Sequence, residues 1–200
     1  LTYVGGDIVF QFDTFEKTSG CWAPQSLMQV GNAWYFLASD GWYVTDGQSA
    51  VPIGTGRFDK TFYSDFDQTY RERVTCALDL VSKIIYWSYP SPSATAGVPD
   101  KLFIYNFIEK RASWAEETVQ MLFSSFTQGY TLDQLDSLYT SIDDITITLD
   151  SSFWSGGIPT VMGFESNTMG TFSGASLVAR FETGETEVEP PGFVYINGVK

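Results

Sequence analysis

The sequence predicts an all-β fold built from antiparallel four-stranded units, and three observations carry that prediction. The 200 residues include 16 Phe, 11 Tyr and 6 Trp, an aromatic content typical of sheets. Eighteen glycines, together with many Ser and Thr, separate short apolar runs, as turns separate strands. The same order of runs and turns also recurs along the chain, with a period of roughly 45 to 50 residues.

The first unit contains the clearest local signal, a hairpin centred on Asp40 and Gly41. Asp-Gly between two aromatic-rich runs is the strongest short-range hairpin signature. A second turn, at Asp46 and Gly47, continues the meander. The expected strands of this unit are 27–30, 34–38, 42–44 and 50–53.

Two further units follow the same outline. Each run has the length of a strand, and each gap carries turn residues, among them Glu109-Lys110 and the Ser-, Ala- and Pro-rich loop 90–99. The third unit turns at Ser166 and Asn167. The expected strands are 74–78, 84–89, 102–106 and 111–114 in the second unit, and 121–123, 160–164 and 169–172 in the third.

Antiparallel units at this spacing are typical of the blades of a β-propeller. A β-sandwich would have similar strand spacing and turns, but the repeat favours the propeller. Because a propeller typically contains about four to eight blades, the sequence is interpreted as a segment of a longer chain, with further blades upstream.

A short helix is expected between the first two units, within residues 59–73. Phe62, Phe66 and Tyr70 follow the spacing of one helical face. An aromatic stripe of this kind is more often core than binding site. The helix is therefore expected to lie over the edge of two adjacent blades.

The longest departure from the repeat is an insertion at residues 129–157, inside the third unit. Residues 1–176 are accordingly interpreted as partial propeller blades. Residues 177–200 are interpreted as the start of a β platform or linker element, with strands at 177–181 and 193–196. Long insertions and terminal strands are candidate contacts between subunits. The candidate interface residues are Leu132, Leu135, Leu138, Trp154, Phe193 and Tyr195.

The composition argues against catalysis by side chains. The sequence contains no histidine, which removes the usual general base, the usual metal ligand and the Ser or Cys triads. Cys21 and Cys76 lack a partner at metal-ligand or redox spacing and are expected to be buried free thiols. The aspartates from Asp133 to Asp150 lack the spacing, central glycine and terminal glutamate of an EF-hand loop. Hence we expect no catalytic residue, no metal, no cofactor and no enzyme.

The charge limits the partners. A formal net charge of −13 leaves no phosphate-neutralising surface over most of the chain, so sequence-specific nucleic-acid binding is not expected. An acidic wall would instead let DNA pass without retaining it, because like charges repel. No apolar run approaches the ~18 residues of a transmembrane helix, so no membrane span is expected.

A series of short motifs runs through most of the chain. They are Val30-Gly31-Asn32, Tyr35-Phe36-Leu37, Asp40-Gly41-Trp42-Tyr43, Pro52-Ile53-Gly54, Asp79, Tyr86-Trp87-Ser88-Tyr89-Pro90, Leu102-Phe103-Ile104-Tyr105-Asn106, Thr131-Leu132-Asp133-Gln134-Leu135-Asp136, Ile142-Asp143-Asp144, Leu149-Asp150-Ser151 and Phe153-Trp154-Ser155-Gly156-Gly157. In this order they resemble tail proteins of tailed bacteriophages, in particular the propeller-bearing tail-hub or nozzle proteins below the portal and adaptor rings.

The resemblance implies a virion structural protein of the phage tail, made in the host cytoplasm. It implies a homo-oligomeric ring around the DNA exit channel, with adaptor or portal proteins as neighbours and passing DNA contacted non-specifically if at all. Such proteins are usually much longer than this chain. Two alternatives stay open: a propeller adhesin that binds a host-surface glycan or protein, and a polysaccharide-acting enzyme that would need convergent carboxylates.

Overall fold

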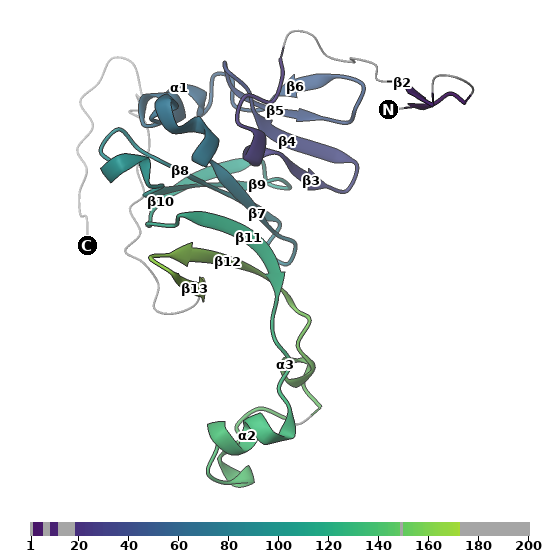
Figure 1. Cartoon of the computed structure of the whole chain (residues 1–200), viewed down its shortest axis with the longest axis vertical. Helices are drawn as coiled ribbons and strands as arrows, with labels where there is room; N and C mark the ends of the chain where they lie inside the picture. Colours follow the sequence, from purple (N-terminus) through teal and green to yellow (C-terminus); the bar gives the residue numbers. More distant parts are fainter. Residues whose placement is uncertain (1, 6–8, 12–18, 149, 173–200) are drawn as a thin grey trace, which may run out of the picture.

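The computed structural model describes residues 2–5, 9–11, 19–148 and 150–172. Antiparallel sheets are the main regular structure of this part, which confirms the prediction of a mostly β fold (Figure 1). A two-stranded ribbon, β1 (Thr2–Tyr3) and β2 (Phe10–Gln11), precedes three larger sheets. Each larger sheet is a meander of strands that are consecutive in sequence.

The first sheet confirms the four strands predicted around the Asp-Gly turn. Its strands, in spatial order, are β3 (Met28–Val30), β4 (Ala33–Leu37), β5 (Trp42–Thr45) and β6 (Ala50–Pro52). The Ala38 N–H donates to the Gly41 carbonyl at 2.9 Å and closes the predicted hairpin. A 3-10 turn, η1 (Pro24–Ser26), leads into the sheet.

The second sheet also has four strands, at the predicted places. They are β7 (Thr75–Asp79), β8 (Ile84–Tyr89), β9 (Lys101–Asn106) and β10 (Arg111–Glu116), with a 3-10 turn, η3 (Thr95–Gly97), between β8 and β9.

Three hairpin loops of the first two sheets are stabilised by the same pattern of hydrogen bonds. Oδ1 of Asp46 accepts from the N–H groups of Gln48 and Ser49, at 2.9 and 3.2 Å. Asp79 and Asn106 each accept in the same way from the second and third residues after them. A side chain that satisfies the turn's backbone donors explains why these residues lie at or just after the ends of strands.

The third sheet contains three strands among the described residues: β11 (Met121–Phe126), β12 (Pro159–Glu165) and β13 (Thr168–Thr171). The predicted turn at Ser166 and Asn167 joins the last two strands, and both residues have positive φ, 45° and 71°. Two left-handed residues in a row fit the twist of a tight hairpin. The predicted insertion departs from the end of β11 and returns at the start of β12.

The three sheets lie one after another, so that the second sheet is packed on both faces (Figure 1). Alternate residues of its strands point to opposite sides. Trp87 and Phe103 belong to the core shared with the first sheet, while Ala77 and Leu102 belong to the core shared with the third.

The core between the first and second sheets is aromatic. Trp42 is fully buried, with its ring centroid 4.5 Å from that of Trp87 and 5.0 Å from that of Phe103. Its Nε1 is buried without a hydrogen-bond partner among the described residues. The Trp87 Nε1–H, in contrast, donates to the Ser26 carbonyl at 2.7 Å and ties η1 to the second sheet.

The predicted helix over residues 59–73 is wrong in extent. Helix α1 covers Asp59–Ser64, and a 3-10 segment, η2 (Gln68–Arg73), follows after a break. Phe62 and Phe66 do reach the aromatic core, as predicted, but Tyr70 lies in η2, where its ring packs against Gly97. The extended backbone of Asp67, whose side chain caps Thr69 N–H, ends the helical spacing that the aromatic residues suggested.

The second and third sheets are joined through their first strands. The Leu122 N–H donates to Thr75 Oγ1 at 2.9 Å, and Ser124 Oγ accepts from the Leu78 N–H at 2.8 Å. Leu122 and Val161 fill the core below these bonds. Two side-chain hydroxyls thus bridge the edges of β7 and β11 and fix how the sheets stack.

Candidate interaction surface

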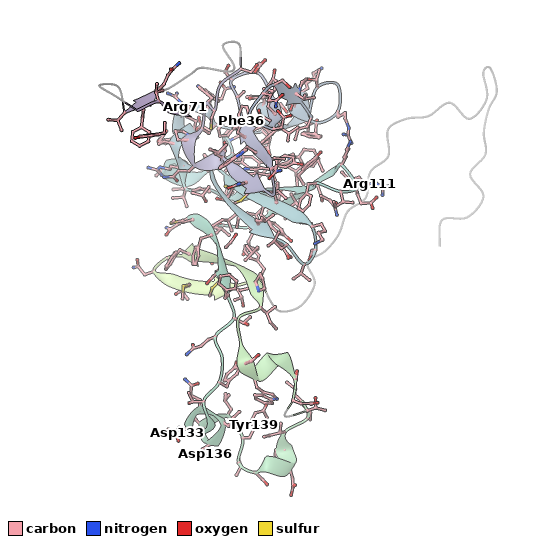
Figure 2. The ribbon with its side chains drawn as sticks, turned by 90° about the vertical axis from the view of Figure 1, so that its right-hand side faces the viewer. Phe36, Arg71, Arg111, Asp133, Asp136 and Tyr139 are labelled. Atoms are coloured by element: carbon pink, nitrogen blue, oxygen red, sulfur yellow. The ribbon has the colours of Figure 1, made fainter. Side chains whose placement is uncertain are left out.

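The insertion forms an arm, residues 127–158, that projects away from the three sheets (Figures 1 and 2). It contains helix α2 (Leu132–Leu138), a 3-10 turn, η4 (Ile142–Asp144), and helix α3 (Ser152–Ser155). Asp133, Asp136 and Tyr139 lie in its far part, remote from Phe36 and Arg111 of the sheets (Figure 2). The arm therefore offers a surface that the sheets do not cover.

Backbone pairing holds the two legs of the arm together where it leaves the sheet. The Thr127 N–H donates to the Ile158 carbonyl and the Gly157 N–H to the Thr127 carbonyl, both at 2.8 Å. One step further out, the Tyr130 N–H donates to the Trp154 carbonyl at 3.0 Å. The attachment of the arm is thus a short two-stranded ladder.

Two glycines allow the legs to meet closely. A Cβ on Gly156 would lie 2.3 Å from the Gly129 nitrogen, and a Cβ on Gly129 would lie 2.8 Å from the Ser155 carbonyl oxygen. Gly156 also has φ of 67°, in the left-handed region that glycine adopts without strain. Gly156 therefore requires glycine for both reasons, and Gly129 requires it for the close approach alone.

Gly156→Ala is therefore expected to break the pairing of the legs without unfolding the sheets. Limited proteolysis should cut within 127–158 faster than in the original chain, while the far-UV circular dichroism of the sheets is retained. Gly157→Ala is the matched control, because Gly157 has a similar φ of 74° but open space around its Cβ position. Equal proteolysis of the two variants would contradict the close contact and leave backbone strain as the cause.

Helix α2 begins at a capping box. Thr131 Oγ1 accepts from the Gln134 N–H, and the Gln134 side chain accepts in turn from the Thr131 N–H, at 3.3 and 3.0 Å. Reciprocal capping satisfies donors that a helix start leaves unpaired. The helix thus has a local reason to form far from the main core.

The six predicted interface residues have different positions. Leu132, Leu135 and Leu138 lie on α2, a helix that the sequence analysis did not predict; Leu135 is half-buried and Leu138 is 56% exposed. Trp154 is partly buried and makes contacts within the arm: its Nε1–H donates to the Thr148 carbonyl at 2.7 Å, and its ring packs edge-on against Tyr130 and Tyr139. The other two, Phe193 and Tyr195, lie outside the described residues.

A second exposed surface, which sequence reasoning missed, is the outer face of the third sheet. Strand pairing places Met121, Phe164 and Met169 in one row across the sheet, with exposed fractions of 49%, 38% and 54%. Phe123 and Met162 form the next row. The sequence does contain an indication of this surface. Strand β11 carries apolar residues on both of its faces, which is typical of a strand covered on two sides.

A groove of about 450 Å³ lies beside this face, at the base of the arm. Half of the residues that line it are apolar or aromatic, among them Phe126, which is 67% exposed. The groove is lined by Ser125, Phe126, Thr127, Gln128, Tyr130, Ile158, Thr160, Met162, Met169 and Thr171.

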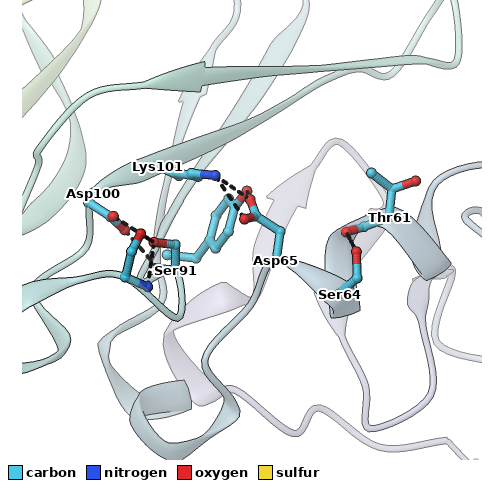
Figure 3. Close-up of polar contacts among 8 residues, drawn as sticks. Thr61, Ser64, Asp65, Ser91, Asp100 and Lys101 are labelled. Carbon is cyan, nitrogen blue, oxygen red and sulfur yellow. Dashed lines mark hydrogen bonds and ion pairs between the residues drawn. The ribbon is translucent and has the colours of Figure 1, made fainter.

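A cluster of polar contacts around Asp65 and Asp100, beside the second sheet, is structural. Lys101 Nζ contacts both oxygens of Asp65, at 2.8 and 2.9 Å, and the Tyr89 hydroxyl donates to the same carboxylate (Figure 3). Ser91, which is 1% exposed, donates its hydroxyl to Asp100 at 2.7 Å. Because a hydroxyl this buried is closed to a substrate, this serine beside a carboxylate is not a nucleophile site.

A buried carboxylate, Asp59, lies at the start of α1. Oδ1 accepts from the Trp42 N–H at 3.2 Å, and a Cβ on Gly41 or Gly54 would collide with the carboxylate. Burial, and to a lesser degree the Asp40 carboxylate, raises the pKa of Asp59, although the Trp42 hydrogen bond opposes the shift. Its contribution to stability is therefore fully present below the ordinary pKa of 3.8 and is lost as pH rises through the folded-state value.

Asp59→Asn retains an acceptor for the Trp42 N–H. It also removes the loss of stability that ionisation of Asp59 causes as pH rises. The variant is expected to melt at a higher temperature than the original at about pH 7, and the difference should vanish below about pH 4. Melting curves from pH 3 to 7 measure it. Asp46→Asn is the control of opposite sign, because hydrogen bonds from Gln48 and Ser49 lower the pKa of Asp46. A constant difference at every pH would contradict a raised pKa.

The two cysteines are free, as predicted, but the expectation that both are buried is wrong. Cys21 is exposed and Cys76 is partly buried. Burial raises the pKa of the Cys76 thiol to about 12, with the neighbouring Cys21 adding to the shift. A thiol with so high a pKa is a weak nucleophile at neutral pH.

Metal and membrane features were also sought in the part of the chain that the structure describes. There, no three His, Cys, Asp or Glu residues are grouped so that they could hold a metal ion. The helices of the same residues are all too short or too polar to cross a lipid bilayer.

Comparison with known proteins gives no assignment. No protein-family model matches the chain, and no curated protein matches it.

Proposed function

We propose that this chain is a structural subunit of a phage tail, a hub or nozzle component that contributes consecutive β-propeller blades to a ring around the DNA exit channel. The observation that carries the proposal is a stack of meander sheets from which an acidic, uncovered arm projects. The resemblance of the sequence motifs supplies the biological setting.

The stacking supports the blade interpretation. Propeller blades are four-stranded meanders arranged radially, with their first strands nearest the axis. Here β7 and β11, the first strands of two consecutive sheets, lie side by side and share the Leu122–Thr75 and Leu78–Ser124 hydrogen bonds. The exposed outer face of the third sheet fits a position where the next blade or a neighbouring subunit would pack.

The arm supports the assembly role. Residues 127–158 contain five aspartates and no lysine or arginine, and α2 also presents Leu138 to solvent. An apolar side chain rimmed by like charges is suited to a specific partner whose surface carries basic residues. We therefore assign the arm to a contact with an adjacent tail subunit.

The acidity of the whole chain fits a conduit. A net charge of −13 repels the phosphate backbone, so DNA can pass a surface of this kind without being held. The acidity gives no reason to propose that the chain recognises a nucleic-acid sequence.

Incorporation into phage particles tests the proposal. Purified tails of a phage that carries this protein should contain it in several copies per tail, and immunogold labelling should place it below the capsid. A chain that instead binds glycans or cells as an isolated domain would support the adhesin alternative, and polysaccharide cleavage lost on a single carboxylate substitution would support the enzyme.

Charge reversal on α2 tests the contribution of the arm. Asp133→Lys with Asp136→Lys is expected to lower incorporation into tails at least ~10-fold, because several like-charge contacts cost a few kcal/mol at an interface. Glu72→Lys with Glu109→Lys is the matched control, since both residues are exposed on the sheet region. Normal incorporation of the α2 variant, with its fold intact, would remove the arm from the interface.

A further inference from the structure

Apolar side chains are exposed at one end of the second sheet, where two of its hairpin loops lie side by side. The loops are residues 80–83, between β7 and β8, and residues 107–110, between β9 and β10. The Phe107 N–H donates to the Lys83 carbonyl at 3.2 Å and joins the two loops. Their exposed apolar residues are Leu80, Val81 and Ile108, at 47%, 68% and 62%. Several exposed apolar side chains on adjoining loops are typical of an interaction site.

Exposed cations border these apolar side chains. Lys83 and Lys110 belong to the two loops, and Arg111 is the first residue of β10. The Arg57 guanidinium donates to the Lys110 carbonyl, which places a fourth cation beside the loops. All four of these residues are exposed.

Two carboxylates lie among the cations and leave the surface basic. Asp79 is partly buried, and its carboxylate accepts from two N–H groups of its own loop. Glu109 is exposed. Four cations against two carboxylates contrast with the net charge of −13 of the whole chain. Residues 80–83 and 107–110, together with Arg57 and Arg111, are called the loop surface below.

The far part of the arm has the opposite charge. Helix α2 and η4 form this part, here called the arm tip. It contains no lysine or arginine, and Leu138 gives it an exposed apolar side chain. Its exposed aspartates are Asp133, Asp136, Asp143 and Asp144. An acidic tip with an exposed leucine complements a basic surface with exposed apolar side chains.

We propose that the arm tip of one copy of this chain docks on the loop surface of a second copy. The inference rests on the proposed function, which assigns the arm to a contact with an adjacent tail subunit. It adds the identity of that subunit and the surface that the arm meets.

The two surfaces lie apart within one chain. Figure 2 shows Arg111 on the sheets and Asp133 and Asp136 at the far end of the arm. Two different surfaces that meet between copies make a head-to-tail contact, which closes into a ring when the rotation between copies permits. Because the chain as a whole is acidic, most of a neighbour's surface repels the arm tip. Attraction at the loop surface therefore determines where the arm binds.

Charge exchange between two variants of the 200-residue chain tests the contact. The arm variant is Asp133→Lys with Asp136→Lys, and the loop variant is Lys110→Glu with Arg111→Glu. Each variant alone brings like charges together and is expected to self-associate at least ~10-fold more weakly than the original chain. An equimolar mixture should recover association, because each arm then meets loops of opposite charge on the other variant. Sedimentation velocity over a series of concentrations measures it.

Arg71→Glu with Arg73→Glu is the matched control, because it makes the same change of charge at exposed residues of η2. Figure 2 shows Arg71 at a distance from Arg111. This control should self-associate as the original chain does. Far-UV circular dichroism verifies that every variant keeps its sheets.

An original chain that stays monomeric, a mixture no more associated than its two components, or a control as weak as the loop variant would overturn the docking. None of these results overturns the tail role, because incorporation of the original chain into tails tests that role separately. Recovered association of the mixture, from a chain that is absent from tails, would support the docking and overturn the tail role.

Discussion

Replacing Trp42 with alanine is expected to lower the free energy of unfolding by about 3–5 kcal/mol, the usual cost of emptying an aromatic core site. Trp42 is fully buried and touches aromatic rings from three elements: Phe62 of α1, Trp87 of β8 and Phe103 of β9. Its loss therefore opens a cavity that both sheets and the helix line. Equilibrium unfolding in urea measures the change.

Trp42→Phe is the matched control for that experiment. It keeps an aromatic ring and removes the buried Nε1–H, which has no hydrogen-bond partner among the described residues. An unpaired buried donor costs about 1–3 kcal/mol, so its removal offsets part of the lost packing. The phenylalanine variant should be much more stable than the alanine variant; equal losses would show that the ring does not join the two sheets.

Leu122→Ala is expected to lower the free energy of unfolding by about 2–5 kcal/mol, through the other core. Leu122 is 2% exposed and packs with Ala77, Leu102 and Val161 between the second and third sheets. Urea unfolding of the variant measures the loss.

Met121→Ala provides the control from the adjacent residue on the opposite face. Met121 is 49% exposed, so its truncation should change stability by less than about 0.5 kcal/mol in the isolated chain. A large loss from Met121→Ala, or none from Leu122→Ala, would mean that the faces of β11 are assigned the wrong way round. Since Trp42 and Leu122 lie on opposite sides of the second sheet, the two large effects should add within about 0.5 kcal/mol.

Much of the strand order could be predicted from local chemistry. The hairpins follow Asp-Gly or Asx turns, as at Asp40 and Asp46, and their side chains or glycines act within a few residues of the sequence. Because a turn bounds each strand at both ends, the turns largely fix where the strand begins and ends. The position of the insertion was predictable for the same reason, because it breaks a repeat.

What could not be predicted depends on contacts distant in sequence. The spacing of Phe62, Phe66 and Tyr70 suggested one helix, but Tyr70 is positioned by Gly97 on another loop. Trp154 packs against Tyr130 and Tyr139 of the same arm, and the sequence alone did not indicate these contacts. The outer apolar face of the third sheet required the register between β11, β12 and β13, which the sequence alone does not give.

Single-particle imaging of the full gene product, purified from tails or coexpressed with the products of neighbouring genes, tests the central claim most directly. The account predicts a closed ring in which these sheets are consecutive propeller blades and each arm contacts an adjacent subunit. A monomeric, self-closed propeller with a ligand-filled pocket and free arms would contradict it.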